Sequence, residues 1–142
     1  MSTNSATAIA KSGAVANSSA VILIGRVLLS SLFILAGYAK LTGIAGTAGW
    51  FASIGLPLPT LVAVGVGLLE LFGGLAILVG FQTRIAAIAL AIFTLAATAI
   101  AHLDFSDQMQ VLLFQKNISI TGGLLILAAF GAGALSIDNR RR

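Results

Sequence analysis

A single carboxylate lies in the middle of an apolar stretch, and few other residues in that environment could do chemistry. The stretch "GVGLLELFGGLAILVG", from Gly65 to Gly80, is apolar except for Glu70. A carboxylate removed from water needs a cationic partner or a proton, because an isolated buried charge is very costly. Arg26 lies in an earlier apolar stretch and is a candidate partner. Glu70 is therefore a candidate for proton exchange or for binding a polar group.

The composition places these residues in a membrane protein. The chain has 142 residues, of which 58% are hydrophobic and only 8% are charged. Apolar runs of 18 or more residues recur, and each can cross a bilayer core of about 30 Å. The chain has no cysteine, which excludes thiolate metal sites, iron–sulfur clusters and thiol redox chemistry within it. The net charge of +4 comes from Lys and Arg residues at the ends of the spans, so we do not expect a nucleic acid partner.

The apolar runs predict an all-α membrane protein built as a four-transmembrane-helix bundle. We expect the spans at about 20–41, 58–81, 84–103 and 116–135, with a loop containing Trp50 after the first span. Residues 1–18 are rich in Ser and Ala and predict a disordered polar tail. Residues 19–138 then form one membrane domain, and residues 139–142 form a basic tail. Ser106 is a candidate cap for a short helix lying on the membrane surface before the last span.

The distribution of basic residues predicts that both termini are cytoplasmic. With that orientation the inside carries Lys11, Arg84 and the final three arginines, and the outside carries only Lys40 and Lys116. An excess of Lys and Arg on the cytoplasmic side is the usual pattern.

Polar and small residues follow one stripe on each predicted span, because positions three or four apart share a helical face. Such residues mediate contacts between membrane helices, so the four stripes should face a shared axis. The stripes are Arg26, Ser30, Phe33, Gly37 and Lys40; Ala63, Gly67, Glu70 and Gly74; Arg84, Ala87, Ala91, Thr94, Thr98 and His102; and Asn117, Thr121, Leu124, Ala128 and Gly131.

Within this bundle we expect a buried polar site made of Arg26 and Glu70, flanked by Gly67 and Gly74. The two glycines would leave space for a partner side chain, a water or a ligand group. Helical side chains lean toward their own N-terminus, so the Arg26–Glu70 pair needs an extended rotamer or a bridging water. Two interpretations stay open: the pair only holds two helices together, or it lines a site that handles protons or binds a polar head group.

A second polar group, Lys40, His102 and Asn117, is predicted at the outer end of the bundle. Lys40 fits the pattern of a lysine that reaches the membrane surface. His102 is the only histidine, and it fits an interfacial hydrogen-bonding residue or a titrating group at the mouth of a site. A single histidine cannot bind haem from both sides, and we expect no metal site.

These residues carry a resemblance to a known family. The pieces "GRVLLSSLFILAGYAKL", "GLP", "LLELFGGLAILVGFQTR", the histidine after the third span and "FQKNISITGGLLIL" occur in the order and spacing typical of the DoxX family of small bacterial membrane proteins. The resemblance covers about 25–138. It implies a four-helix protein of the bacterial inner membrane, and it implies that the family's charged pattern falls on Arg26, Lys40, Glu70, Arg84, His102, Lys116 and Asn117.

The same resemblance implies a role in redox chemistry, because members are described as oxidoreductase subunits and the name-giving relatives act with quinones. We expect a membrane subunit or accessory protein of a quinone-linked system, embedded in the lipid bilayer with a redox enzyme or a further copy as partner. No catalytic motif is present in this chain, so catalytic residues stay unassigned. No cofactor is expected within the chain, and a quinone is the ligand that the site could accept. The alternatives are a proton-coupled transporter or permeability factor for a weak acid or thiol compound, and a membrane scaffold for a partner protein.

Overall fold

The computed structural model describes the backbone of residues 3–141 and, within it, the side chains of Thr7 and of residues 18–141. Its elements are all helices: α1 (Thr3–Thr42), α2 (Ile44–Ser53), α3 (Pro59–Val79), α4 (Thr83–Ala101), α5 (Gln108–Phe130) and α6 (Ile137–Arg140). Four segments are long and apolar enough to cross a membrane, namely Ser18–Thr42, Pro59–Val79, Thr83–Ala101 and Gln108–Phe130. The predicted all-α protein with four membrane helices is confirmed. The division into a disordered tail, a membrane domain and a basic end stays a prediction.

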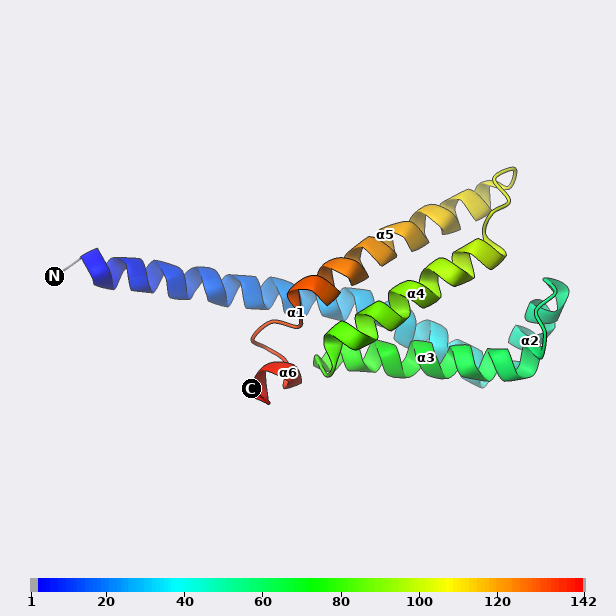
Figure 1. Cartoon of the computed structure of the whole chain (residues 1–142), viewed down its shortest axis with the longest axis horizontal. Helices are drawn as coiled ribbons and strands as arrows, with labels where there is room; N and C mark the ends of the chain where they lie inside the picture. Colours follow the sequence, from blue (N-terminus) through cyan, green and yellow to red (C-terminus); the bar gives the residue numbers. More distant parts are fainter. Residues whose placement is uncertain (1–2, 142) are drawn as a thin grey trace.

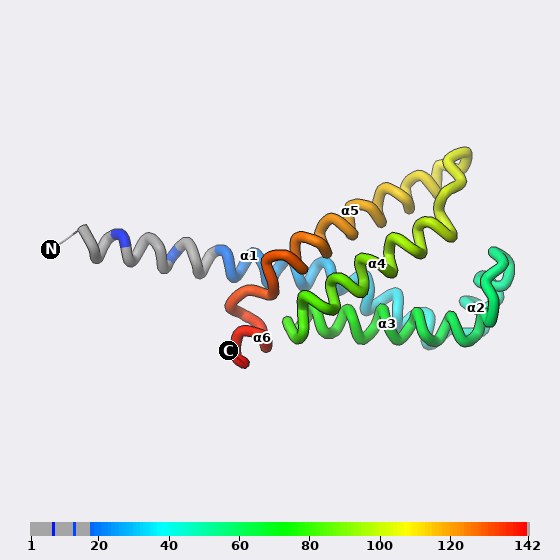
Figure 2. Tube along the Cα trace, in the orientation of Figure 1, coloured from blue at the N-terminus to red at the C-terminus, as the bar shows by residue number. Residues whose placement is uncertain are grey.

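The membrane helices form two antiparallel pairs. The second half of α1 packs against α3, and α4 packs against α5. In Figure 1 the two pairs lie close together near the α3–α4 link and diverge toward the end that holds α2 and the α4–α5 turn. The trace in Figure 2 places α6 near the α3–α4 link, at the opposite end from α2. The bundle therefore has a closed end near α6 and a splayed end near α2.

Glycines bring α1 and α3 into direct backbone contact, as expected for small residues between membrane helices. A Cβ atom at Gly37 of α1 would lie 2.7 Å from the carbonyl oxygen of Gly67 in α3, which is too close for any side chain. Gly67 and Gly74 were expected to leave space beside Glu70, but that space is already filled. A Cβ at Gly67 would lie 2.9 Å from the side chain of Leu41, and one at Gly74 would lie 2.9 Å from Ile34. The two glycines are packing positions for α1.

The predicted inward stripes face the interior of the bundle. All residues of the four stripes are buried or half-buried, except Arg84 at the start of α4, which is exposed.

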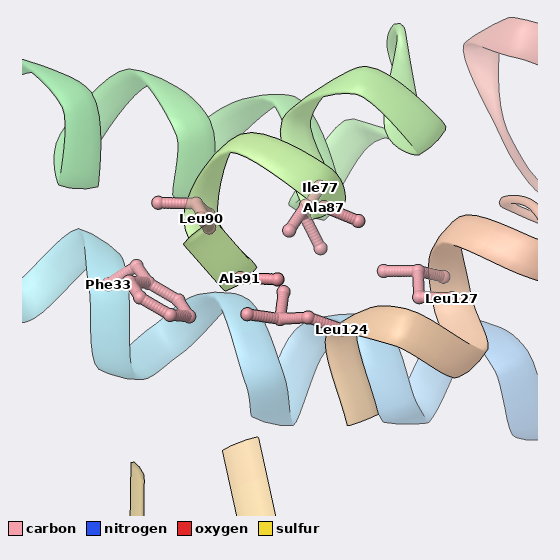
Figure 3. Close-up of a cluster of buried hydrophobic side chains, with 7 residues drawn as sticks. All are labelled: Phe33, Ile77, Ala87, Leu90, Ala91, Leu124 and Leu127. Carbon is pink, nitrogen blue, oxygen red and sulfur yellow. The ribbon is translucent and has the colours of Figure 1, made fainter. Parts of the chain in front are cut away.

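Between the two ends of the bundle, large and small apolar side chains from α1, α3, α4 and α5 form one core, drawn in Figure 3. Its buried members are Phe33, Ile77, Ala87, Leu90, Ala91, Leu124 and Leu127. This core separates the closed end from the splayed end.

Two connecting segments differ from the sequence-based expectation. The predicted loop around Trp50 is the helix α2, which packs on α3 through Phe51 and Ala63. The predicted surface helix near Ser106 is absent from the described residues, because α5 begins at Gln108 and continues into the span.

The turn before α5 is capped by Asp107 rather than Ser106. Asp107 accepts a hydrogen bond from the Met109 N–H, while Ser106 donates its hydroxyl hydrogen to Asp104. The hydrogen bonds from Ser106 lower the pKa of Asp104.

Candidate functional site

Arg26 is buried at the closed end of the bundle, and its partners are backbone carbonyls rather than Glu70. Only 2% of its surface is exposed. Its Nε donates to the carbonyl of Ile77 at 2.9 Å and its Nη2 to that of Leu78 at 2.6 Å. Its Nη1 donates to the carbonyls of Ala132 and Leu135, both at 2.8 Å. The predicted Arg26–Glu70 pair is therefore wrong, because the guanidinium donates instead to carbonyls at the end of α3 and in the segment after α5.

A second charged residue, Asp138, stabilises the closed end of the bundle through hydrogen bonds to the backbone. Its carboxylate accepts hydrogen bonds from the N–H groups of Gln82 at 2.7 Å and Thr83 at 2.9 Å, and its own N–H donates to Gly80 at 2.8 Å. Asp138 thus caps the start of α4 from a distant part of the chain, where the helix dipole favours negative charge. Partial burial acts to raise the pKa of Asp138, but the hydrogen bonds from Thr83 and Gln82 outweigh it and hold that pKa below its usual value.

Glu70 is paired with Lys40, at the splayed side of the core. The Nζ of Lys40 lies 2.7 Å from the Oε2 of Glu70, and the side chains are 25% and 7% exposed, respectively. The prediction that Lys40 only reaches the membrane surface is corrected. Its position near the end of α1 allows it to lean back toward its own N-terminus, while Glu70 leans toward the N-terminal end of α3, so the two charged groups meet.

A cavity of about 540 Å³ opens beside this ion pair, between the diverging helix pairs. All four membrane helices and α2 contribute to its walls. Most of the lining is apolar, including Trp50 and Phe51 of α2, whose ring centroids lie 5.4 Å apart. The polar lining groups are Lys40, Glu70, Thr94, His102, Lys116 and Asn117. An apolar cavity with a few convergent polar groups is the usual form of a small-molecule site.

The predicted outer-end residues His102 and Asn117 lie in the wall of the same cavity as Glu70. The Nδ1 of His102 is 2.7 Å from the Oε1 of Gln110, which holds the ring in position. The Nδ2 of Asn117 donates to the hydroxyl of Thr98 at 2.9 Å and links α5 to α4. The structure therefore joins Glu70 to the predicted outer-end group and leaves Arg26 apart.

Several lining residues were not among the sequence-based candidates for a site. Trp50 was expected in a loop after the first span, whereas α2 places Trp50 and Phe51 in the wall of the cavity. Thr98 was placed on an inward stripe, but its hydrogen bond with Asn117 was not foreseen. The spacing of Thr94, Thr98 and His102 on one face of α4 was the signal that could have extended the site to this helix.

Comparisons with known proteins agree with this architecture. Residues 21–103 match the family model described as DoxX. The chain is 45% identical over 102 residues to the inner membrane protein YqjF of Escherichia coli K12. The aligned region covers 70% of this chain and 75% of that protein. It is 36% identical over 106 residues to the inner membrane protein YphA of the same organism, covering 71% of this chain and 76% of that protein. No solved structure matches significantly. The chain, with its four membrane helices, is a multi-pass protein of the bacterial inner membrane and belongs to the DoxX family.

Proposed function

We propose that this protein is the membrane subunit or accessory protein of a redox system, and that its cavity binds the head group of a quinone-type molecule. The observation that carries the proposal is the convergence of Lys40, Glu70, His102 and Asn117 on one largely apolar cavity. A quinone has an apolar tail and ring, which fit the apolar walls, and two ring oxygens, which need polar groups at one end of the site. An electron-transfer cofactor would come from a partner enzyme.

The cavity supports binding more strongly than transport. A proton-coupled transporter for a weak acid or thiol compound needs a route to both sides of the membrane. The fully buried core residues Leu90 and Leu124 lie between the cavity and a second, largely apolar cavity of about 510 Å³ that Arg26 lines. This core supports a site from which a molecule leaves by the route through which it entered.

The single tryptophan gives a direct test, because Trp50 lines the cavity. The purified full-length protein in lipid nanodiscs would be titrated with a short-chain benzoquinone while the Trp50 fluorescence is recorded. We expect saturable quenching, and we expect the Lys40→Met variant to weaken it. N-acetyltryptophanamide in empty nanodiscs provides the correction for absorption and collisional quenching. Quenching that rises linearly, as it does for this control, would remove the binding proposal and favour a scaffold.

We also propose that both termini are cytoplasmic. The basic residues support this orientation. Arg84 in the first turn of α4 and Arg140 in α6 belong to the elements of the closed end, and Asp104 and Asp107 lie in the α4–α5 turn, with Lys116 following in α5. The protein has no cysteine, so single cysteines at Ser5, Thr47, Gln108 and Asn139 can be probed in whole cells with an impermeant thiol reagent. We expect labelling at Thr47 and Gln108 only. Labelling at Ser5 or Asn139, with protection of the other two positions, would reverse the orientation.

A further inference from the structure

We infer that the protein binds an anionic phospholipid, with one acyl chain in the second cavity and the phosphate group at Arg84. This inference goes beyond the proposed function and does not rest on it, because the two cavities share only Ile120 among their lining residues. Two separate features point to this class of lipid. They are an apolar groove on the outside of the bundle and an unpaired cation at one end of that groove.

The second cavity is a groove between two membrane helices. Its lining residues belong to α1, to α5 and to Gly131, which directly follows α5. The helices α1 and α5 contact each other much less than the helices within either antiparallel pair do, so a space stays open between the pairs. Along α5 the groove extends from Ser119 to Phe130, which is about 16 Å at the helical rise. This length matches one leaflet of a bilayer core of about 30 Å, and therefore one acyl chain.

The lining of the groove suits a hydrocarbon chain better than a polar molecule. Ile126 and Phe130 expose 64% and 79% of their surfaces, respectively. The hydroxyl of Ser119 already donates to the carbonyl of Gln115 at 2.9 Å. The guanidinium of Arg26 already donates to four carbonyls, and only 2% of this residue is exposed. An acyl chain therefore covers apolar surface here without leaving a polar group unsatisfied.

The unpaired cation at the closed end of the groove is Arg84. A Cβ atom at Gly131 would lie 3.5 Å from the Nε of Arg84 and 3.6 Å from its Nη2, so the guanidinium lies beside a lining residue of the groove. Arg84 is exposed, and within the described part of the chain its side chain makes no hydrogen bond or ion pair. Its planar fork of N–H donors matches the geometry of a phosphate group.

No acidic side chain of this protein is placed to pair with Arg84, even if a second copy lies alongside. The chain has four acidic side chains. Glu70 is paired on the splayed side of the core, and Asp138 caps α4. Asp104 and Asp107 lie in the α4–α5 turn, at the opposite end from Arg84. Copies in one membrane share an orientation, so the anion at Arg84 comes from outside the protein.

The surrounding charge favours a lipid with a net negative head group over a zwitterionic one. Arg140 and Arg141 at the closed end are also exposed, and the guanidinium of Arg141 lies 5.3 Å from the ring centroid of Phe81 in the α3–α4 link. These arginines repel the ammonium group of a zwitterionic head group and attract an anionic one. Basic sites beside membrane helices bind anionic lipids in this way.

The first test compares two lipids that carry the same oleoyl chains, phosphatidylglycerol and phosphatidylcholine. Each is titrated into the full-length protein in a neutral detergent, and the bound lipid is counted by native mass spectrometry. We expect phosphatidylglycerol to bind on the order of tenfold more tightly. Arg84→Met should remove most of this preference. Arg140→Met is the matched control, because it removes an equal charge from the same end and should keep most of the preference.

The second test fills the groove. Gly25 lines it, and a Cβ atom there would have no neighbour within 4 Å, so Gly25→Leu places its side chain in the groove without disturbing the fold. Binding of both lipids should weaken on the order of tenfold, because the acyl chain loses its contacts. Gly65→Leu is the matched control, because a Cβ atom at Gly65 also meets open space and Gly65 lines neither cavity.

Each outcome decides one part of the inference. Equal binding of the two lipids, or an equal loss in Arg84→Met and Arg140→Met, overturns the head-group site. Unchanged lipid binding in Gly25→Leu overturns the groove as the site of the acyl chain. A wild-type dimer that Gly25→Leu separates into monomers would assign the groove to a second copy instead. If Gly25→Leu does not insert, the comparison of the lipids on the wild type and Arg84→Met decides alone.

Discussion

The two ends of the bundle each bury a charged residue, but they satisfy it in different ways. At the closed end, Arg26 donates to four backbone carbonyls from two parts of the chain. At the splayed end, Glu70 has one contact to a half-buried lysine and faces a cavity of about 540 Å³. A buried polar group with all its partners supplied by the backbone contributes to the fold, whereas one with unused hydrogen-bonding capacity beside a cavity is available for a ligand.

The largest effect is expected from Arg26→Met. The substitution leaves the carbonyls of Leu78, Ala132 and Leu135 without the donor that Arg26 supplies, and that of Ile77 with only the Gly80 N–H at 3.2 Å. Unsatisfied buried groups cost about 1–3 kcal/mol each. We expect the free energy of unfolding to fall by more than about 3 kcal/mol, with low abundance in the membrane. The measurement is thermal unfolding in mild detergent, together with blotting of membrane fractions.

Arg84→Met is the control for this variant, because it removes an exposed arginine from the same end. It should leave stability within about 0.5 kcal/mol of the wild type. If Arg26→Met were as stable as Arg84→Met, the closed end would not depend on the guanidinium, and the contrast between the two ends would fail.

The second prediction concerns the pair Lys40 and Glu70. In a double-mutant cycle of Lys40→Met and Glu70→Gln, we expect a coupling energy on the order of 1–2 kcal/mol, because each single change leaves one buried charge without its partner. The cycle of Arg26→Met with Glu70→Gln should instead be additive within about 0.5 kcal/mol, because the two residues do not meet. Coupling in the second cycle and additivity in the first would restore the pair that the sequence suggested.

The smallest effect is expected from Asp138→Asn. The variant weakens the cap of α4 and should lose about 1 kcal/mol at pH 7, near the middle of the range for caps. Since the folded-state pKa of Asp138 lies below its usual value, the ionised carboxylate stabilises the fold fully above the unfolded pKa of about 4. This stabilisation is lost as the pH falls through the lower folded-state pKa.

Thermal unfolding between about pH 7 and pH 3 would check this prediction, with the wild type approaching the variant at the acidic end. A gap of constant size across this range would mean that the charge of Asp138 does not contribute to the cap. Ligand affinity should stay unchanged in Asp138→Asn, since the residue lies at the closed end. A loss of affinity would show that the two ends are coupled.

Much of the fold could be predicted because membrane helices obey a simple pattern. Long apolar runs located the four spans, and the 3.6-residue period placed the faces of Ser30, Gly37, Ala63 and Thr98 inward. Pro59 occupies the first turn of α3, the position in a helix that proline favours. The helix α2 was missed, because its two glycines and three alanines resemble a flexible connection, and only the packing of Phe51 on α3 identifies it as a helix.

The partners of the charged residues could not be predicted in the same way. Sequence reasoning searched for an acidic side chain near Arg26, whereas the acceptors are carbonyls at a helix end and in a segment more than 100 positions away. Backbone acceptors have no signature in the residue types. For Glu70 the sequence did contain a signal. Helical side chains point toward the N-terminus of their own helix, which separates Glu70 from Arg26 and brings Glu70 and Lys40 toward each other.

The network around Arg26 also has a consequence for the order in which the protein can be completed during synthesis. Arg26 is made 51 residues before Ile77 and 109 residues before Leu135. At a typical rate of translation, the last of its acceptors follows it on the order of ten seconds later. Until then Arg26 has only the two acceptors that α3 supplies, the carbonyls of Ile77 and Leu78. The short segment between α5 and α6 therefore completes the acceptor set of Arg26 only after all four membrane helices have been made.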